Sequence, residues 1–384
     1  MTDPRADVGD SGRGLAREVL IHGPIARSEL GRRLGLSAAS LTRLSKPFLD
    51  RGLFIEAPEL LDGAVGRPAK PLDVRVDAQR FFGIKVTGEQ ALGVATDLRT
   101  NVLGSATANL IGRRPEDAVD AIAAIIDELA PQTGSGPLTA IGVSIGGKVT
   151  GSRMVTRAPF LDWHDVDLAA LVERRFGVPA VIENDVVALT EAEHWFGQAR
   201  GAENFAVITT GAGVGYGLVI HDRQVITPDT GLGLGGHFPI DPTGPLCSTG
   251  HRGCSSAMLS IPSMCATAGV GLGHEIGYEE LLDLSLDVDA PGHAVAAQVV
   301  QASGRALGRL IAAAANLAMV SAVVLSGEGI RLAHVASEAM HEAIAADRDA
   351  DAEPMTVLID DPDFTTWARG AAAVAIQSTF GRLV

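Results

Sequence analysis

The alternation of strand and helix patterns that begins at Phe81 constrains the fold more than any other feature of the 384-residue sequence. The pattern opens with three short apolar runs separated by turn residues, at 82–86, 91–97 and 101–105. Runs of this length and spacing predict a three-strand meander. A helix is expected at 115–130, where apolar residues recur at helical spacing, and a buried strand at 138–144. The chain is therefore expected to contain an open α/β sheet.

Two polar residues end one of the later strands. The run 178–185 reads as a strand that finishes on Asn184 and Asp185. Open α/β sheets bind ligands at the carboxyl ends of their strands, so we expect these two side chains in a ligand site.

A glycine-rich turn follows the next predicted strand, at 205–210. The turn at 211–213 either cradles phosphate with its backbone N–H groups or simply allows tight packing, and the sequence leaves both open. A helix at 301–319 and a strand at 322–327 complete the α/β pattern.

The first eighty residues have a different pattern. Residues 1–13 are polar and rich in Gly and Asp, and we expect them to be loose. Two short helices are expected at 15–21 and 28–34, and Ser37 is a natural N-cap for a third. Two helices, a turn that contains Gly35 and a further helix are the pattern of a helix-turn-helix.

The third helix carries small and polar residues on one side and apolar residues on the other. Small residues let a helix sit deep in the DNA major groove, and strands at 53–56 and 72–76 predict a β-wing beside it. Taken alone, such a helix is more often an ordinary amphipathic surface helix, and the wing alone would be read as a basic loop, but three elements in this order favour DNA binding. The expected DNA-binding residues are Ser37, Ser40, Thr42, Arg43, Lys46, Arg67 and Lys70.

The charge distribution separates the same two regions. The chain has a net charge of −15, which taken alone argues against nucleic-acid binding. Residues 13–75 contain 11 Lys and Arg against 7 Asp and Glu, a net charge of +4, which leaves −19 for the remainder. The N-terminal segment is therefore the part expected to face DNA phosphates.

Composition indicates a cytoplasmic protein with no membrane partner. The sequence has no run of eighteen uncharged apolar residues, and its first residues lack the apolar core of a signal peptide. Three cysteines, an odd number, agree with a reducing compartment.

Residues 231–256 form a Gly- and Pro-rich loop with two of the three cysteines and a histidine. His237, Cys247 and Cys254 point to zinc more readily than to a disulfide, because Zn²⁺ binds sulfur and nitrogen ligands that a turn can bring together. A closed structural site needs four ligands. Zinc is thus a candidate cofactor, and the alternative that we favour is a metal-free loop in which the two cysteines are small buried residues.

The sequence resembles the ROK family (repressor, open reading frame, kinase) of sugar kinases and sugar-responsive regulators, from Leu15 to the end of the chain. The matching segments are the Gly-Arg-Pro wing at 66–68, 158–163, 183–185, the Thr-Gly-x-Gly turn at 210–213, 236–237 and 325–327. The resemblance implies an α/β fold in which a winged helix-turn-helix at 1–78 precedes a two-lobed, actin-like and hexokinase-like (ribonuclease H-like) ROK domain at 79–384. That domain would bind the effector and oligomerise.

One departure from the family bears on catalysis. The family's kinases begin the ATP-binding lobe with Asp-x-Gly-Gly-Thr-Lys, whereas this chain has Lys85 and Glu89 in place of the Asp and the Thr. A cation where Mg²⁺ needs a carboxylate, and an anion where phosphate would lie, both oppose nucleotide binding. We expect no ATP binding and no catalytic residue. Asp185 matches the family's catalytic base and is expected instead to accept a hydrogen bond from a ligand hydroxyl.

Further departures concern metal and sugar. The family's second cysteine is replaced by Thr249, so the remaining zinc position goes to water, to His251 or to nothing. The resemblance also implies that His237 contacts the ligand together with the 184–185 pair. Leu234 and Ser256 replace two carboxylates of the family's sugar site, which weakens sugar binding or shifts the ligand to one with fewer hydroxyls.

We therefore expect a DNA-binding transcriptional regulator of the ROK type, a repressor that binds a palindromic double-stranded operator as a homodimer or dimer of dimers. Its degenerate kinase cleft would bind a sugar or sugar derivative as effector. The alternative is a ROK-type sugar kinase with an appended DNA-binding domain, and a third possibility is a partner-binding module with a vestigial cleft.

Overall fold

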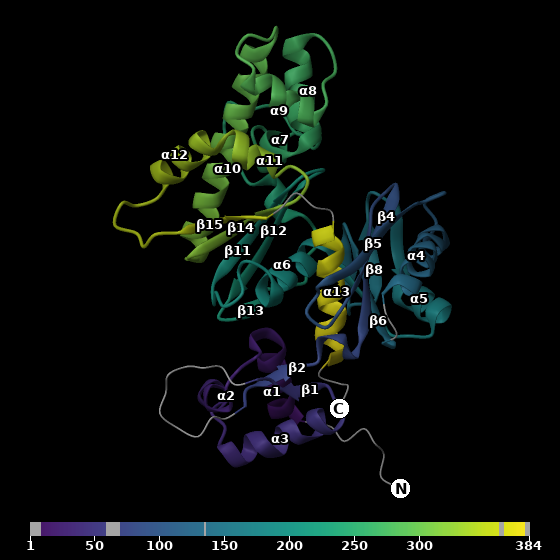
Figure 1. Cartoon of the computed structure of the whole chain (residues 1–384). Helices are drawn as coiled ribbons and strands as arrows, with labels where there is room; N and C mark the ends of the chain where they lie inside the picture. Colours follow the sequence, from purple (N-terminus) through teal and green to yellow (C-terminus); the bar gives the residue numbers. More distant parts are fainter. Residues whose placement is uncertain (1–8, 59–69, 134–135, 361–364, 381–384) are drawn as a thin grey trace. The chain divides into compact units, whose positions relative to one another are not determined.

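A computed structural model describes residues 9–58, 70–133, 136–360 and 365–380 (Figure 1). The chain divides into two compact units. Unit 1 comprises Met1–Ala188 and Thr365–Val384, and unit 2 comprises Leu189–Phe364. The chain thus leaves unit 1 and returns to it with its last helix.

Unit 1 begins with a small helical segment that ends in two paired strands. Its elements are α1 (Gly9–His22), α2 (Arg27–Leu34), α3 (Ala38–Asp50), β1 (Phe54–Glu56) and β2 (Leu72–Val74). The two strands pair antiparallel, and the stacked rings of Phe48 and Phe54, with centroids 4.6 Å apart, join α3 to β1. The helices and the wing strands predicted for a winged helix-turn-helix are therefore present.

Helix α1 starts earlier than its sequence suggests. The loose segment predicted up to residue 13 is wrong for the described residues 9–13, which are helical. Asp10 lies in the first turn, where the partial positive charge of the helix N-terminus favours a carboxylate. Its Oδ1 also accepts a hydrogen bond from Arg13 Nη2 at 2.7 Å. Capping charge and the buried Leu15 thus outweigh the low helix propensity of the two glycines.

The α/β part of unit 1 is built on a five-stranded sheet with the order β10-β6-β3-β4-β5. The strands are β3 (Arg80–Val86), β4 (Gln90–Thr96), β5 (Val102–Asn109), β6 (Leu138–Ile145) and β10 (Ala180–Asn184). The first three form the predicted antiparallel meander, and β6 and β10 add to β3 in parallel. Asn184 therefore lies at the carboxyl end of the edge strand.

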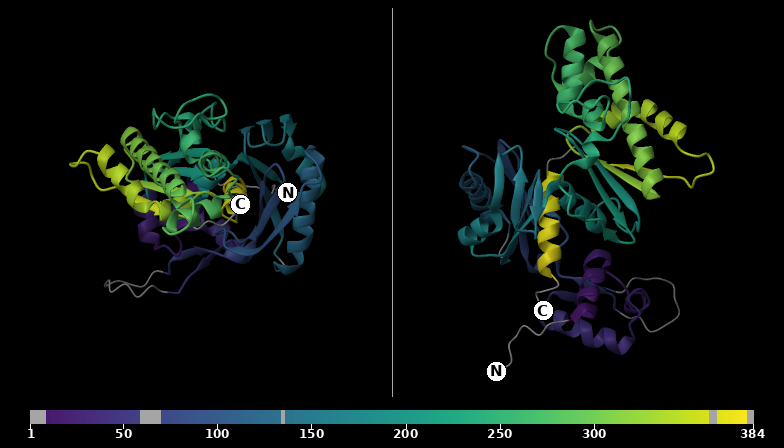
Figure 2. Two further views of the ribbon diagram at one scale, coloured as in Figure 1. Left: turned by 90° about the horizontal axis from the view of Figure 1, so that it is seen from above. Right: turned by 180° about the vertical axis from the view of Figure 1, so that it is seen from behind.

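Helices cover both faces of this sheet (Figures 1 and 2). On one face, α4 (Pro115–Leu129) and α5 (Leu168–Phe176) bury apolar side chains against the strands. On the other lies α13 (Thr365–Phe380), the helix that follows unit 2 in the chain. Glycines let α13 approach closely: a Cβ on Gly142 would lie 1.7 Å from the Ala371 carbonyl oxygen, and one on Gly83 would lie 2.0 Å from that of Ala368.

A small antiparallel sheet follows β6 and was not indicated by the sequence pattern. It contains β7 (Lys148–Thr150), β8 (Met154–Ala158) and β9 (Trp163–Asp167). These strands are short and lack a clear alternation of apolar and polar residues, so no period-2 signal identifies them.

Unit 2 repeats the strand arrangement of unit 1. Its sheet has the order β13-β12-β11-β14-β15, with an antiparallel meander followed by two parallel strands. The strands are β11 (Phe205–Thr210), β12 (Val214–Ile220), β13 (Arg223–Gln224), β14 (Ala322–Ser326) and β15 (Thr356–Ile359).

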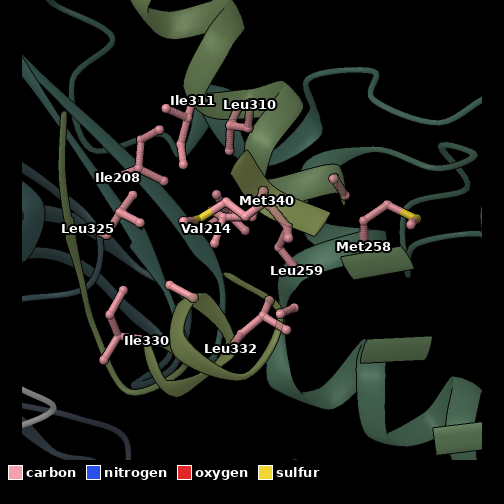
Figure 3. Packing of buried hydrophobic residues seen from close by; sticks show 14 of the residues in the cluster. Ile208, Val214, Met258, Leu259, Leu310, Ile311, Leu325, Ile330, Leu332 and Met340 are labelled. Carbon is pink, nitrogen blue, oxygen red and sulfur yellow. The ribbon is translucent and has the colours of Figure 1, made fainter. Parts of the chain in front are cut away.

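The helices of unit 2 share a continuous apolar core with this sheet (Figure 3). They are α7 (Ser255–Leu259), α8 (Ile261–Leu272), α9 (Tyr278–Leu286), α10 (His293–Ala318), α11 (Arg331–Val335) and α12 (Ser337–Asp347). Ile208 and Leu325 from the sheet meet Ile311 of α10 and Met340 of α12 in this core. A further helix, α6 (Asp185–Phe196), carries the chain from unit 1 into unit 2.

Helix α10 corrects one sequence prediction. The predicted start at residue 301 is eight residues too late, because the helix begins at His293. Ala296 and Val300 are fully buried and extend the apolar stripe of the later turns backwards at a spacing of four residues. Gly292 precedes the helix with a left-handed φ of 93°.

Searched over the described residues, the structure contains no helix with the length and apolar character needed to cross a membrane.

Candidate functional site

The exposed face of α3 carries the predicted DNA-binding residues that lie in the helical segment. Ser37 caps the helix by accepting a hydrogen bond from the Ser40 backbone N–H at 3.2 Å, which confirms the N-cap prediction. Thr42, Arg43 and Lys46 are exposed. Leu41, Ser45 and Phe48 are buried on the opposite side.

The polar groups on this face are held only by local contacts. Thr42 Oγ1 donates to the Ala38 carbonyl oxygen at 2.9 Å, and Lys46 Nζ pairs with Asp50 Oδ2 at 3.1 Å. An exposed ion pair of this kind contributes at most about 1 kcal/mol, so Lys46 is readily available to a phosphate. Lys70 is exposed just before β2, and Arg67 lies outside the described residues.

Lys85 and Asp185 form an ion pair that links the first strand of the unit 1 sheet to the start of α6. Lys85 Nζ donates to Asp185 Oδ2, and the two side chains are 8% and 16% exposed. The ammonium also lies 4.9 Å from the ring centroid of Trp367 on α13, a cation–π geometry. The carboxylate that the resemblance assigns to catalysis is therefore neutralised by a cation of the same chain.

Asn184, the other residue predicted at this strand end, also has partners within the chain. Its Nδ2 donates to the Gly147 carbonyl oxygen at 2.8 Å. Its Oδ1 accepts from the backbone N–H groups of Val186 and Val187 at 3.0 and 3.2 Å. Asn184 thus caps the first turn of α6 and anchors the loop after β6. His237, the third predicted ligand residue, belongs to unit 2.

The Cys/His loop of unit 2 brings four metal-ligand side chains together. They are His237, Cys247, His251 and Cys254, with donor atoms that all lie within 4.8 Å of one another. The short helix Leu234–His237 presents the first of them, and the last directly precedes α7. His251 therefore completes the set that the sequence left with an open position at Thr249.

A tight turn explains how Cys247 and His251 reach the same point. The Cys247 N–H donates to the His251 carbonyl oxygen at 2.9 Å, and the Gly250 N–H donates to the Cys247 carbonyl oxygen at 2.9 Å. Gly250 has a φ of 90°, a left-handed backbone conformation that residues other than glycine rarely adopt. The four-residue spacing between the two ligands thus follows from the turn itself.

The donor distances fit a tetrahedral zinc ion. Cys247 Sγ lies 3.8 Å from His237 Nδ1 and 3.7 Å from His251 Nδ1, and Cys254 Sγ lies 3.6 Å from His237 Nδ1. Zinc–sulfur and zinc–nitrogen bonds arranged tetrahedrally would place such ligand atoms roughly 3.3–3.8 Å apart. The residues present therefore fit a Cys₂His₂ site.

Thr249 lies beside this donor set. Its Oγ1 is 3.1 Å from Cys247 Sγ and 3.1 Å from His251 Nδ1. The hydrogen bond from the threonine hydroxyl lowers the pKa of the Cys247 thiol to about 5, whereas burial raises the pKa of the Cys254 thiol. A thiolate is the form of cysteine that binds metal, so Thr249 supports the site without being a ligand.

Sequence reasoning did not find the pairing of Lys85 with Asp185. The two residues are 100 positions apart, and no local pattern joins them. The signal that could have suggested it was chemical, because a lysine on a buried strand needs a carboxylate nearby. His251 was a sequence candidate, and the structure places it with the other three donors.

The chain thus joins a winged helix, a fold typical of DNA-binding domains, to two α/β sheets of identical strand order. A model of the ROK family matches residues 81–377. The chain belongs to the ROK family.

Curated relatives of the chain bear the names of repressors. The chain is 27% identical to the DNA-binding transcriptional repressor Mlc of Escherichia coli over 77% of its own length and 75% of the relative's. It is 26% identical to a xylose repressor of Bacillus spizizenii, over 71% of its own length and 71% of the relative's. These names agree with the predicted class of transcriptional regulator.

Solved structures share the fold. A ROK family transcriptional regulator described as a homologue of E. coli Mlc aligns with a TM-score of 0.80 at 22% identity, over 98% of this chain and 97% of the other. A ROK family glucokinase from Streptomyces griseus, solved with glucose and AMPPNP, aligns with a TM-score of 0.65 at 24% identity, over 78% of this chain and 99% of the other. The predicted fold class, an α/β chain with a winged helix-turn-helix before a hexokinase-like ROK body, is confirmed.

Proposed function

We propose that the chain is a transcriptional repressor of the ROK type that reads a palindromic DNA operator with α3, as a homodimer or dimer of dimers. The observation that carries the proposal is the exposed polar face of α3 within a helical segment that ends in a paired wing. A recognition helix of this kind docks in the major groove, and a dimer reads two half-sites. The residues proposed to contact DNA are Ser37, Ser40, Thr42, Arg43, Lys46, Arg67 and Lys70.

The charge balance supports this assignment. The segment 13–75 has a net charge of +4 in a chain of net charge −15. Several of its arginines are already paired, including Arg32 and Arg33 with Glu29 on α2. Arg43 instead is exposed on the recognition face, which makes it the strongest candidate for reading a base.

Operator binding tests the proposal directly. The protein would be used to select its sites from random duplex DNA, and the selected operator compared with scrambled DNA. Residues 1–78 are proposed as the DNA-binding domain and 79–384 as the effector and oligomerisation domain, so deleting 1–78 should abolish binding. Retained binding by the truncated chain would refute the assignment.

A point variant separates base reading from phosphate binding. Arg43→Ala should weaken operator binding by about 1–3 kcal/mol if this side chain reads a base. Arg174→Ala, which removes an exposed arginine from α5, is the matched control and should leave binding unchanged. If Arg43→Ala loses the same amount of affinity for operator and for scrambled DNA, Arg43 contacts a phosphate and does not read a base.

We also propose that the chain is not a kinase and binds no ATP. The pairing of Lys85 with Asp185 supports this, because a carboxylate held by a nearly buried ammonium is a poor base and a poor Mg²⁺ ligand. Protein with ATP, Mg²⁺ and glucose, N-acetylglucosamine, N-acetylmannosamine or xylose should show no phosphorylation above a denatured control. Turnover that disappears in Asp185→Asn would contradict the proposal and favour the kinase alternative.

The effector proposed for the regulator is a sugar or sugar derivative, with Asn184, Asp185 and His237 as its contacts. Asn184 and Asp185 are engaged within unit 1, so a ligand hydroxyl would have to share or replace those hydrogen bonds. We therefore expect weak binding. A thermal-shift screen with the same four sugars should give a shift with at least one of them, and loss of operator binding with that sugar would identify the effector.

Zinc is proposed as the cofactor of the Cys/His loop. His237, Cys247, His251 and Cys254 would hold it, and zinc would supply a closed structural cross-link without taking part in chemistry. Metal analysis of protein purified without a His-tag should give one equivalent of zinc that survives dialysis. Metal-free protein that remains folded would restore the metal-free alternative.

A further inference from the structure

An arginine on the turn between β4 and β5 contacts the winged helix. Arg99 Nε donates to the Leu20 carbonyl oxygen at 3.0 Å, and Arg99 Nη2 donates to the Val19 carbonyl oxygen at 3.3 Å. The same Nη2 pairs with Asp73 of β2. We call these contacts the Arg99 joint. One guanidinium thus binds the end of α1 and the wing strand together.

The electrostatics of the joint favour this arrangement. Val19 and Leu20 lie in the last turn of α1, whose carbonyl oxygens carry the partial negative charge of a helix C-terminus. The side chains of Arg99 and Asp73 are 20% and 16% exposed, so solvent screens the pair only in part. A planar guanidinium with several donors can satisfy two carbonyls and a carboxylate at once, which an ammonium cannot do.

The joint leaves no room for other side chains. A Cβ on Gly23, the residue after α1, would lie 2.5 Å from Asp73 Oδ1 and 2.8 Å from Arg99 Nη2. One backbone hydrogen bond accompanies the joint, from the Leu98 N–H to the Val76 carbonyl oxygen at 3.1 Å. The contact is therefore close and mainly polar.

The turn that carries Arg99 is itself fixed. Asp97 Oδ1 accepts from the backbone N–H groups of Arg99 and Asn101 at 2.8 and 3.0 Å. Arg369 Nε of α13 donates to the Thr100 carbonyl oxygen at 3.3 Å. The arginine is thus mounted on a rigid turn that the last helix of unit 1 also holds.

We propose that Arg99 is a positioning residue that fixes the winged helix on the β4–β5 turn, so that two copies present their α3 helices at the spacing of a palindromic operator. The proposal rests on the proposed function. Arg99 does not itself contact DNA, and it acts on affinity only where both half-sites must be engaged together, because a loosely held head lowers the effective concentration of the second contact.

Two DNA probes test this role: the selected palindrome and a duplex with one half-site. Arg99→Ala should bind the palindrome about tenfold more weakly and the half-site within about twofold of the parent protein. The affinity of Arg99→Lys for the palindrome should lie between that of the parent protein and that of Arg99→Ala. Arg174→Ala should bind both probes as the parent does. The salt dependence of half-site binding should not change, because no phosphate contact is lost.

A measurement without DNA separates this proposal from the proposed function. Hydrogen exchange followed by mass spectrometry should show faster exchange in Arg99→Ala at residues 15–25 and 70–76, with no change in β6. Asp73→Asn should show the same pattern to a smaller extent, because the two carbonyl contacts remain.

Each result decides something. Unchanged palindrome binding or unchanged exchange in Arg99→Ala overturns the proposal. Equal loss on both probes, with fast exchange throughout α1 to β1, assigns Arg99 a purely structural role and also overturns it. If the parent protein selects no DNA sequence, the proposed function fails, and the exchange data alone decide whether Arg99 holds the winged helix.

Discussion

The sheets of unit 1 and unit 2 have the same strand order, but the turns after their first strands are built differently. In unit 1 the turn between β3 and β4 contains Glu89, and the strand before it carries Lys85 in its ion pair with Asp185. In unit 2 the turn between β11 and β12 keeps two glycines.

Backbone contacts and the Thr209 hydroxyl, which accepts from the Gly215 N–H at 3.1 Å, hold the turn of unit 2. The Gly211 carbonyl oxygen accepts from Ile261 N–H at 2.8 Å, and the Thr210 carbonyl oxygen accepts from Gly329 N–H at 2.8 Å. The two units therefore show that one scaffold tolerates either a charged or a glycine-lined turn. In unit 1 the charged residue belongs to the turn itself, whereas in unit 2 a glycine lets a charged side chain approach from outside the turn: a Cβ on Gly211 would lie 2.0 Å from Glu328 Oε2.

The largest expected effect breaks the contact between the unit 1 sheet and α13. Gly142→Val places side-chain atoms where the Ala371 carbonyl oxygen already lies, 1.7 Å from an ideal Cβ. We expect a loss of about 3 kcal/mol in the free energy of unfolding of unit 1, with unit 2 unaffected. Hydrogen exchange measured at increasing urea concentrations would report the stability of unit 1 through β6 and that of unit 2 through β11. Loss in both units together would show that they unfold as one.

The second effect concerns the ion pair of unit 1. Lys85→Met leaves the Asp185 carboxylate without its cation. Because that carboxylate is 16% exposed and keeps some contact with water, we expect the free energy of unfolding to fall by only about 2 kcal/mol. Lys85→Met/Asp185→Leu should recover most of that loss, since both charges are then absent. Thermal unfolding of the single and double variants would show this, and a single variant as stable as the parent would mean that the pair contributes nothing.

The third effect concerns the Cys/His loop of unit 2. His251→Ala should release zinc and lower the free energy of unfolding of unit 2 by about 1.4 kcal/mol at zinc tenfold above its Kd. His274→Ala, an exposed histidine outside the cluster, is the matched control. Thr249→Cys combined with His251→Ala should hold zinc again. If His251→Ala keeps a full equivalent, the fourth ligand is another group.

The smallest effect is expected in the glycine turn of unit 2. A Cβ on Gly213 meets no atom within 4 Å, so Gly213→Ala should change the free energy of unfolding by less than about 0.5 kcal/mol. Chemical denaturation of Gly213→Ala and of Gly142→Val under the same conditions would compare how the two sheets tolerate a side chain at a glycine. A large loss at Gly213 would show that the turn needs a glycine for its conformation rather than for space.

Local signals predicted much of this structure. Helix α5 begins after Asp167, whose carboxylate accepts from the Ala170 N–H at 2.9 Å, and ends before Gly177 in a left-handed conformation. Both residues are typical helix boundaries, so local signals mark the two ends of this helix. By contrast, the predicted start of α10 was eight residues late, although Ala296 and Val300 continue its apolar stripe back towards His293.

The site was predicted less completely. The α3 face and the Cys/His loop are each contained in one short segment, so their residues could be named from the sequence. The partner of Lys85 and the contacts of Arg99 come from segments far along the chain. Such pairings are set by the packing of whole elements, and spacing along the sequence does not encode them.

The position of α13 in the chain order has a consequence for synthesis. The strands β3 and β6 leave the ribosome long before residues 365–380, and the glycine-lined face that α13 covers has no partner until then. At roughly 5–20 residues per second this interval lasts on the order of ten seconds. Unit 1 therefore completes its fold only after the whole of unit 2 has been synthesised, and until then this face of its sheet stays uncovered.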